Sequence, residues 1–163
     1  MIRHVCSTDA QAIVDIYNWY IQESSITFEE QTIDAQHLQE RILSITNELN
    51  LPWLVCEFEG RVVGYAYASQ WKQRSAYRFS VEVSVYLDPE YQGRGLGRQL
   101  YAELFNLLQH SDIHSALAVI TLPNEASVAL HEKLGMKKVA HFEQVGYKFE
   151  QWQDVGYWQI IFD

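Results

Sequence analysis

The sequence predicts a mixed α/β fold, in which one sheet of parallel and antiparallel strands carries helices on both faces. Segments with the two-residue alternation of strands interrupt segments with helical periodicity in an uneven order, which favours a mixed sheet. The 163 residues suit one domain with a sizeable core, and 48% of them are hydrophobic. No linker, repeat or low-complexity stretch divides the chain, so we expect a single domain over residues 1–163.

The N-terminal part of the chain predicts a short strand and two helices. The strand covers residues 1–6, and Thr8 with Gln11 predicts a capping box at the start of a helix that runs to about Glu23. Asp34 opens the second helix. The apolar stripe expected on the second helix consists of Leu38, Ile42, Ile45 and Leu49.

A hairpin and a long central strand follow. Strands over residues 53–58 and 61–67 are joined by the turn Glu59-Gly60. Gly64 lies inside the second of these strands and predicts a bulge. A polar, cationic connection then leads to the central strand, which we expect over residues 77–87.

The C-terminal part alternates between helix and strand and ends in two strands. Gly135 terminates the second of its helices in the C′ position. The expected elements are a helix over 95–110, a buried strand over 116–121, a short helix over 126–134 and strands over 137–148 and 152–162. The complete order is therefore β-α-α-β-β-β-α-β-α-β-β.

Charge and cysteine content limit the classes of partner. The net charge of -9 argues against nucleic acids and anionic membranes as partners. Cys6 and Cys56 have no spacing motif and are expected to be reduced thiols in a cytoplasmic protein. The N-terminus has no apolar signal region, and no apolar run reaches the length of a membrane span. Basic residues gather locally, which suits a small anionic ligand: Lys72, Arg74, Arg78, Arg94 and Arg98.

The stretch over residues 81–98 carries the densest functional signal. Val81, Val83 and Val85 alternate with residues that face the other side of the strand, and the first of these is Glu82. A loop with three glycines then precedes a helix. Such a loop lets backbone N–H groups turn towards a ligand, and the helix N-terminus behind it attracts an anion. The loop has neither the ending of a Walker A loop nor the spacing of a dinucleotide-binding loop.

The loop sequence Gln92-x-x-Gly95-x-Gly97 resembles the pyrophosphate loop of the GCN5-related N-acetyltransferases, the GNAT family. The predicted element order is also that of this family, so the resemblance covers the whole chain. Several segments resemble one branch, the phosphinothricin and methionine sulfone/sulfoximine acetyltransferases. They are Ile16-Tyr17-Asn18, Thr27-Phe28-Glu29, Gly64-Tyr65-Ala66, residues 76–86, 123–127 and 130–135, and Val145-Gly146-Tyr147-Lys148. Two departures are Met136, where the branch usually has Phe, and the variable segment Lys72-Gln73-Arg74.

The resemblance implies an enzyme that uses acetyl-CoA as the donor and places a catalytic glutamate at Glu82. Acetyl transfer to an amine requires loss of a proton from the amine, which a buried carboxylate with a raised pKa can accept. The alternative for Glu82 is a strand residue that faces solvent or pairs with Arg78. His131 lies near the position where many relatives have a tyrosine acid and could protonate the leaving thiolate. A core histidine would explain it equally well.

The resemblance also assigns residues to the coenzyme. Backbone groups of Val85, Tyr86 and Leu87 would bind the pantetheine arm like an added strand. The pyrophosphate would lie on Gly93, Arg94, Gly95, Leu96, Gly97 and Arg98, although both arginine side chains could equally be solvated. Asn124 and Ser127 would contact the coenzyme arm, and Lys133 a phosphate; the alternatives are a helix N-cap for Asn124 and solvent exposure for Lys133.

An amino acid acceptor brings a carboxylate, which arginine binds with two parallel hydrogen bonds. Arg74 and Arg78 are the candidates for this role. Residues expected to line the same pocket are Lys72, Gln73, Val83 and Ser84, with Phe28 and Glu29 reaching in from the first loop. A surface cation is the alternative for Lys72.

The sequence thus predicts an acetyl-CoA-dependent N-acetyltransferase of a small amino acid or analogue, such as phosphinothricin, methionine sulfoximine or methionine sulfone. One alternative is a protein or peptide N-acetyltransferase of the same fold, which would need an open groove. Another is a non-catalytic acyl-CoA sensor, which would not need Glu82. The resemblance further implies a homodimer. We expect no metal, because His110 and His114 lack a third ligand.

Overall fold

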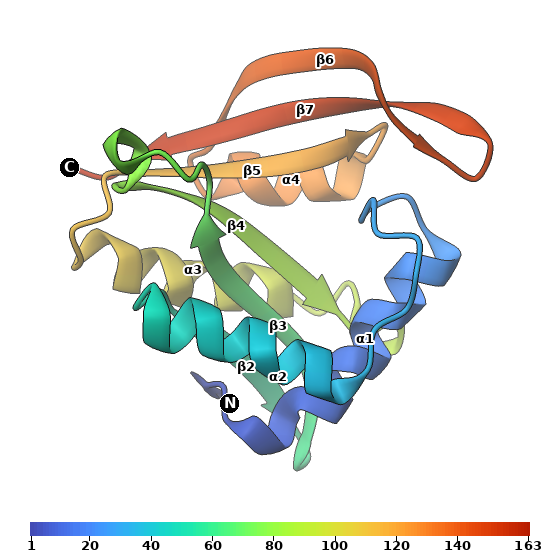
Figure 1. The fold of residues 1–163 in the computed structure, drawn as a ribbon, viewed down its shortest axis with the longest axis vertical. Coiled ribbons are helices and arrows are strands. Elements are labelled where there is room, and N and C mark those ends of the chain that lie inside the picture. The colour runs from blue at the N-terminus through green and yellow to red at the C-terminus, as the bar shows by residue number, and fades with distance from the viewer.

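The computed structural model describes residues 1–163 and contains one seven-stranded sheet with helices on both faces (Figure 1). The order of strands and α-helices is the predicted one, and no helix is long and apolar enough to cross a membrane. The elements are β1 (Ile2–His4), α1 (Ala10–Glu23), α2 (Ala35–Leu43), β2 (Trp53–Phe58), β3 (Arg61–Gln70), β4 (Ser80–Leu87), α3 (Leu96–Gln109), β5 (Ser115–Leu122), α4 (Glu125–Lys133), β6 (Lys137–Lys148) and β7 (Gln151–Ile161).

The strands lie in the order β1-β2-β3-β4-β5-β7-β6, and only β4 and β5 are parallel neighbours. Their pairing is short and ends at Glu82 and Leu117. Beyond this point the two strands diverge, as Figure 1 shows, although each continues for five more residues. The sheet is therefore split at its centre, where backbone groups of both strands have no neighbouring strand.

Two hydrophobic cores cover the two faces of the sheet. The larger core packs α3 against the central strands and includes Val81 and Val83. The other packs α1 and α2 against β2 and β3, with Tyr86 at its margin. Because side chains alternate along β4, Glu82 and Ser84 share the face of Tyr86, towards α1 and α2.

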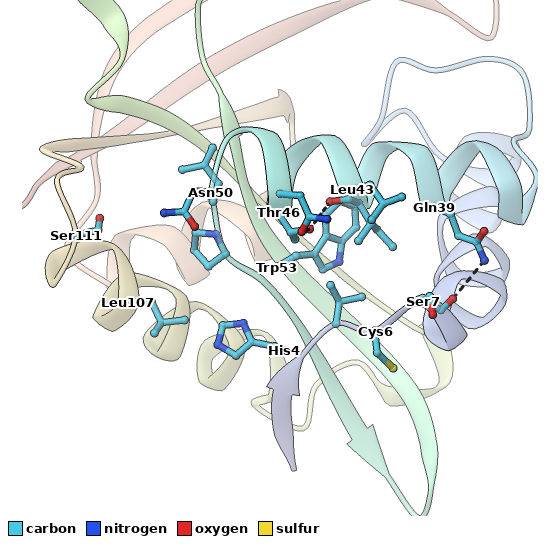
Figure 2. A pocket seen from close by; sticks show the side chains of 15 residues that line it. His4, Cys6, Ser7, Gln39, Leu43, Thr46, Asn50, Trp53, Leu107 and Ser111 are labelled. Carbon is cyan, nitrogen blue, oxygen red and sulfur yellow. Dashed lines mark hydrogen bonds between the residues drawn. The ribbon is translucent and has the colours of Figure 1, made fainter.

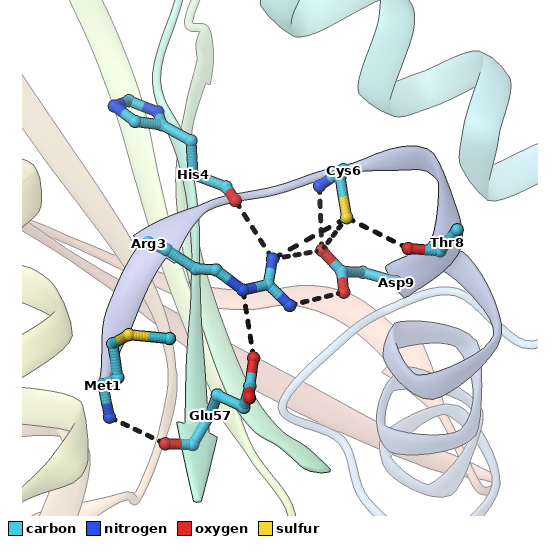
Figure 3. Close-up of polar contacts among 7 residues, drawn as sticks. All are labelled: Met1, Arg3, His4, Cys6, Thr8, Asp9 and Glu57. Carbon is cyan, nitrogen blue, oxygen red and sulfur yellow. Dashed lines mark hydrogen bonds and ion pairs between the residues drawn. The ribbon is translucent and has the colours of Figure 1, made fainter. Parts of the chain in front are cut away.

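The start of α1 differs from the prediction. A short 3-10 turn over Ser7–Asp9 precedes the helix, and Cys6, not Thr8, is its N-cap. The backbone N–H of Cys6 donates to the carboxylate of Asp9 at 2.8 Å. The same carboxylate binds the Arg3 guanidinium, which also reaches Glu57 (Figure 3). The capping box with Thr8 was therefore wrong, because the ion pair between Asp9 and Arg3 of β1 fixes an N-cap two residues earlier, at Cys6.

Two other boundaries also differ. The α2 helix starts at the predicted place, with Asp34 as its N-cap, but it ends at Leu43 and is followed by a π-helical turn over Ser44–Glu48. Leu49 lies beyond that turn and is 39% exposed, so its place in the apolar stripe was wrong. The central strand begins at Ser80 because residues 75–77 form a 3-10 turn.

Candidate active site

The split between β4 and β5 exposes one edge of β4. Asp88 N–H donates to the carbonyl of Val63, so even-numbered residues of β4 exchange hydrogen bonds with β3. The odd-numbered residues Val85 and Leu87 therefore direct their backbone N–H groups into the split. Tyr86 pairs with Tyr65, so the backbone groups of Tyr86 are bonded to β3 and do not face the split. The structure thus offers an extended ligand the amides of Val85 and Leu87, in the manner of an added strand.

The glycine-rich loop follows directly at the end of this edge. Gly93 and Gly95 have φ values of 74° and 76°, a left-handed conformation that other residues rarely adopt. Gly95 is the N-cap of α3, and no side chain caps this helix. The first helical bond runs from Gln99 N–H to Gly95, so the amides of Leu96, Gly97 and Arg98 remain available. Arg94 and Arg98 are exposed beside them. An anion at this helix end would meet free N–H groups and the positive end of the helix dipole.

Tyr20 of α1 connects the loop to β4. Its hydroxyl donates to the carbonyl of Leu87 at 2.6 Å and accepts from the Gln92 side chain at 2.9 Å. Tyr20 is 4% exposed, so both bonds lie at the edge of the core. Tyr20 was not among the predicted site residues, since nothing in its local pattern distinguishes it from the other core residues of α1.

Glu82 is the last residue of β4 that pairs with β5, so its carboxylate stands where the split opens. Burial raises the pKa of this carboxyl above its ordinary value, and the positive charge of Lys72 partly offsets the effect. Glu82 forms no ion pair, and Arg78 instead donates to the Ser75 carbonyl. The pairing of Glu82 with Arg78, the structural alternative, is thus not observed. A carboxylate of this kind is suited to accept a proton near neutral pH.

The other predicted acceptor residues lie on different surfaces. Lys72, Gln73, Arg74 and Arg78 are exposed residues of the connection between β3 and β4. Ser84 shares the face of Glu82. Val83 points into the core beneath α3 and is 3% exposed, so only its backbone can approach a ligand on the Glu82 side.

A cavity of about 240 Å³ lies beside this face, between α2 and β3. Tyr67 and Ser69 line it, and in the β3–β4 register they lie opposite Ser84 and Glu82. Tyr17 and Arg41 form its other side, and both bind Glu29 of the loop after α1. Arg41 was not predicted; its guanidinium is held by the Glu29 carboxylate.

The molecule has a larger cavity of about 530 Å³, which lies away from Glu82 between β1, the end of α2 and the end of α3 (Figure 2). None of the predicted site residues lines it. Trp53 alone borders both cavities. We favour the smaller cavity as the place of the chemistry, because its lining residue Ser69 pairs with Glu82 across β3 and β4, whereas no residue of β3 or β4 lines the larger cavity.

Comparison with known proteins agrees with this geometry. The profile of the acetyltransferase (GNAT) domain matches residues 2–156. The chain belongs to the GNAT family of acetyltransferases. It is 40% identical to a phosphinothricin N-acetyltransferase of Streptomyces viridochromogenes, over 99% of this chain and 87% of that protein. It is 35% identical to an L-methionine sulfoximine/L-methionine sulfone acetyltransferase of Salmonella typhimurium, over 99% of this chain and 94% of that protein.

Solved structures show the same fold. A phosphinothricin acetyltransferase of Sinorhizobium meliloti in complex with acetyl-CoA superimposes with a TM-score of 0.96 at 33% identity, over 99% of this chain and 88% of that one. The protein is thus an N-acetyltransferase with acetyl-CoA as its donor. The free amides of β4 and the uncapped start of α3 fit an extended arm that ends in a diphosphate.

Of the residues predicted to bind the coenzyme from α4 and its N-cap, Asn124 and Ser127 bind each other and Lys133 is exposed. Asn124 is the N-cap of α4 and accepts from Ser127 N–H at 3.1 Å, the alternative given above for this residue. Lys133 is exposed in the last turn. The Asn124 side-chain NH₂ group is not used by this cap, whereas the Ser127 hydroxyl lies 3.4 Å from Nδ1 of His131.

His131 is 4% exposed, and both of its ring nitrogens are engaged. Nδ1 lies 2.6 Å from the carbonyl of Ser127 and must carry the proton, so Nε2 accepts from the Tyr101 hydroxyl at 3.1 Å. Burial lowers the pKa of the imidazole, with a smaller opposing effect from the Ser127 carbonyl. His131 therefore has no free nitrogen for a thiolate, and a role as acid would have to pass through Tyr101.

Proposed function

We propose that this GNAT enzyme transfers the acetyl group of acetyl-CoA to the α-amino group of a small amino acid or analogue. The relatives named above act on phosphinothricin, methionine sulfoximine and methionine sulfone, and acceptors of this type suit the observed site. The observation that carries the proposal is the Glu82 carboxyl, whose pKa is raised by burial. Glu82 is the last residue of β4 that pairs with β5, and it lies opposite Ser69, which lines a cavity of about 240 Å³. A cavity of that size holds an amino acid, whereas a protein substrate needs an open groove.

Strand β4 and the segments before and after it then have separate roles. Glu82 accepts the proton of the acceptor ammonium group, directly or through one water. The Val85 N–H points into the split and is the available donor for a developing oxyanion. Gly93 to Arg98 hold the diphosphate through backbone N–H groups, with Arg94 and Arg98 adding positive charge. The acceptor carboxylate forms an ion pair with one of three cations, Lys72, Arg74 or Arg78.

We also propose that the protein is a cytoplasmic homodimer. Both cysteines are free thiols, which is typical of a reducing compartment. Strand β6 is at the edge of the sheet, and the β6–β7 hairpin carries several exposed apolar side chains. These are Phe142, Val145, Tyr147, Phe149 and Trp152, each at least 47% exposed. Such a surface favours association of two subunits, and light scattering on the purified protein tests it.

An acceptor screen tests the enzymatic proposal. The protein and acetyl-CoA are mixed with free amino acids, with their sulfone, sulfoximine and phosphinic analogues, and with peptides, and release of free thiol is followed. We expect turnover with L-methionine sulfoximine or phosphinothricin and none with peptides. Turnover restricted to peptides would overturn the assignment of the acceptor. Acetyl-CoA binding without turnover of any acceptor would favour the sensor.

A further inference from the structure

Strand β6 holds the loop between α1 and α2 through a buried lysine. Lys148 is 2% exposed, and its ammonium group donates to the carbonyls of Ser24 at 2.7 Å and Thr27 at 2.8 Å. No carboxylate pairs with it. Its ammonium nitrogen also lies 5.0 Å from the centroid of the Phe149 ring. A buried cation without a carboxylate partner is costly, so we interpret this contact as one that fixes the loop in position. The two segments are 124 residues apart in sequence, and Figure 1 shows the β6–β7 hairpin curving towards this loop.

Gly146, two residues earlier on the same face of β6, makes room for an aromatic ring of the loop. A Cβ atom at this position would lie 2.3 Å from Cζ and 2.4 Å from Cε2 of Phe28. Real Cβ contacts are never so short, so the Phe28 ring lies directly on the β6 backbone. Phe28 is still 40% exposed, which leaves part of its ring for another contact.

The other side of the loop is bound to the walls of the acceptor cavity. The Thr27 hydroxyl lies 2.8 Å from that of Tyr17, and the Glu29 carboxylate binds both Tyr17 and Arg41. Tyr17 and Arg41 line the cavity of about 240 Å³. The loop is therefore clamped between β6 and the cavity, and a shift on the β6 side would be transmitted to the cavity wall.

We propose that Gly146 and Lys148 are positioning residues for the acceptor: by seating Phe28 and the carbonyls of Ser24 and Thr27, they set the shape of the acceptor side of the site. This inference rests on the proposed function. Neither residue touches the split strands or the glycine loop, so acetyl-CoA binding does not depend on them. The affinity for the acceptor and the choice of acceptor do depend on Gly146 and Lys148.

Gly146→Ala and Lys148→Met test the inference, with Val139→Ala as a control on an exposed side chain of β6. A displacement of about 1 Å can cost up to about 100-fold, so we expect the KM for L-methionine sulfoximine to rise about tenfold. The KM for acetyl-CoA should change less than about twofold. Phe28→Leu in the Gly146→Ala background removes the clash, so the double variant should be no worse than Phe28→Leu alone. Equal rises in both KM values, or additive losses in the double variant, would overturn the proposal.

Limited digestion with chymotrypsin, which cleaves after Phe28, gives a readout without turnover. Release of the loop should make this cleavage about tenfold faster in both variants, in line with a lost loop contact of about 1.4 kcal/mol, and leave the Val139→Ala control unchanged. If the unaltered enzyme acetylated no amino acid, the proposed function would fail. If the rate of cleavage after Phe28 were unchanged in both variants, Gly146 and Lys148 would not hold the loop, and this inference would fail. The two failures are therefore distinguishable.

Discussion

Replacement of Glu82 by glutamine isolates the proposed general base. Gln has nearly the same shape, forms hydrogen bonds and cannot accept the ammonium proton. The side chain at this position faces α1 and α2, whereas the coenzyme contacts are backbone amides of Val85 and Leu87 and of the glycine loop. Glu82→Gln should therefore leave acetyl-CoA binding intact while it removes the proton acceptor.

The size of the loss follows from the role. A positioned base contributes about 10²–10⁴-fold to the rate, so kcat should fall by that factor. At about 1.36 kcal/mol for each factor of ten, this corresponds to about 2.7–5.4 kcal/mol of activation free energy. The KM for acetyl-CoA should stay within about twofold, because a lost interaction that forms only in the transition state lowers kcat alone.

Stability should move in the opposite direction. Burial raises the pKa of the Glu82 carboxyl in the folded protein, so the folded state binds its proton more tightly than the unfolded state does. The stability contributed by this group is complete below the unfolded pKa and is lost as the pH rises through the folded value. At pH 8 the charged carboxylate therefore destabilises the fold, and Glu82→Gln should melt at the same temperature as the unaltered protein or higher.

Three measurements decide this prediction: steady-state thiol release with L-methionine sulfoximine, calorimetric titration of acetyl-CoA and thermal melting at pH 8. The expected pattern is lost turnover, retained coenzyme affinity and undiminished stability. A kcat within about threefold of the unaltered enzyme lies far below the expected effect of a base and would refute the assignment of Glu82. Loss of coenzyme binding or a lower melting temperature would show that the carboxylate is structural.

Further substitutions probe the surroundings of Glu82. Lys72→Met removes the cation that lowers the pKa of Glu82, so the acid limb of the pH profile of kcat/KM should move to higher pH. Tyr20→Phe breaks bonds to Leu87 and Gln92 and should raise the KM for acetyl-CoA more than that for the acceptor, with about 1–3 kcal/mol of stability lost in urea titration. Gly64→Ala would place a Cβ 2.5 Å from the Leu87 side chain and 3.2 Å from the Tyr86 carbonyl, and should cost about 1–3 kcal/mol in the same titration.

Local patterns in the sequence were sufficient for the order of elements, for the orientation of Glu82 and for the glycine loop at a helix start. The two-residue alternation over residues 81–86 places Glu82 opposite to the core valines, and the structure confirms this placement. The glycine loop at a helix start is equally a local property, because its conformation depends on glycine at residues 93 and 95. The helix start at Asp34 and the turn at Glu59-Gly60 also follow from residues within a few positions.

What the sequence did not reveal depends on contacts between distant segments. A capping pattern at Thr8 looked sound, yet the ion pair of Arg3 with Asp9 fixed a different start of the helix. Tyr20 and Leu87 are 67 residues apart, and no periodicity reports their hydrogen bond. The proposed roles of Gly146 and Lys148 could not be predicted for the same reason. In the sequence these residues fit the ordinary two-residue alternation of a strand, and only the fold brings the loop after α1 into contact with them.

The split sheet explains how one strand can serve two ligands without conflict. Along β4 the odd-numbered residues point their backbone into the split and their side chains into the core, while Glu82 and Ser84 bond to β3 and point their side chains towards the acceptor cavity. A shift of register by one residue would reverse both assignments at once. The paired start of β4 and β5 at residues 80–82 and 115–117 prevents that shift. This pairing therefore aligns Glu82 with the backbone amides that face the coenzyme. Substitutions in the paired residues of β4 and β5 should impair binding of both substrates, whereas substitutions of Gly146 and Lys148 should impair binding of the acceptor alone.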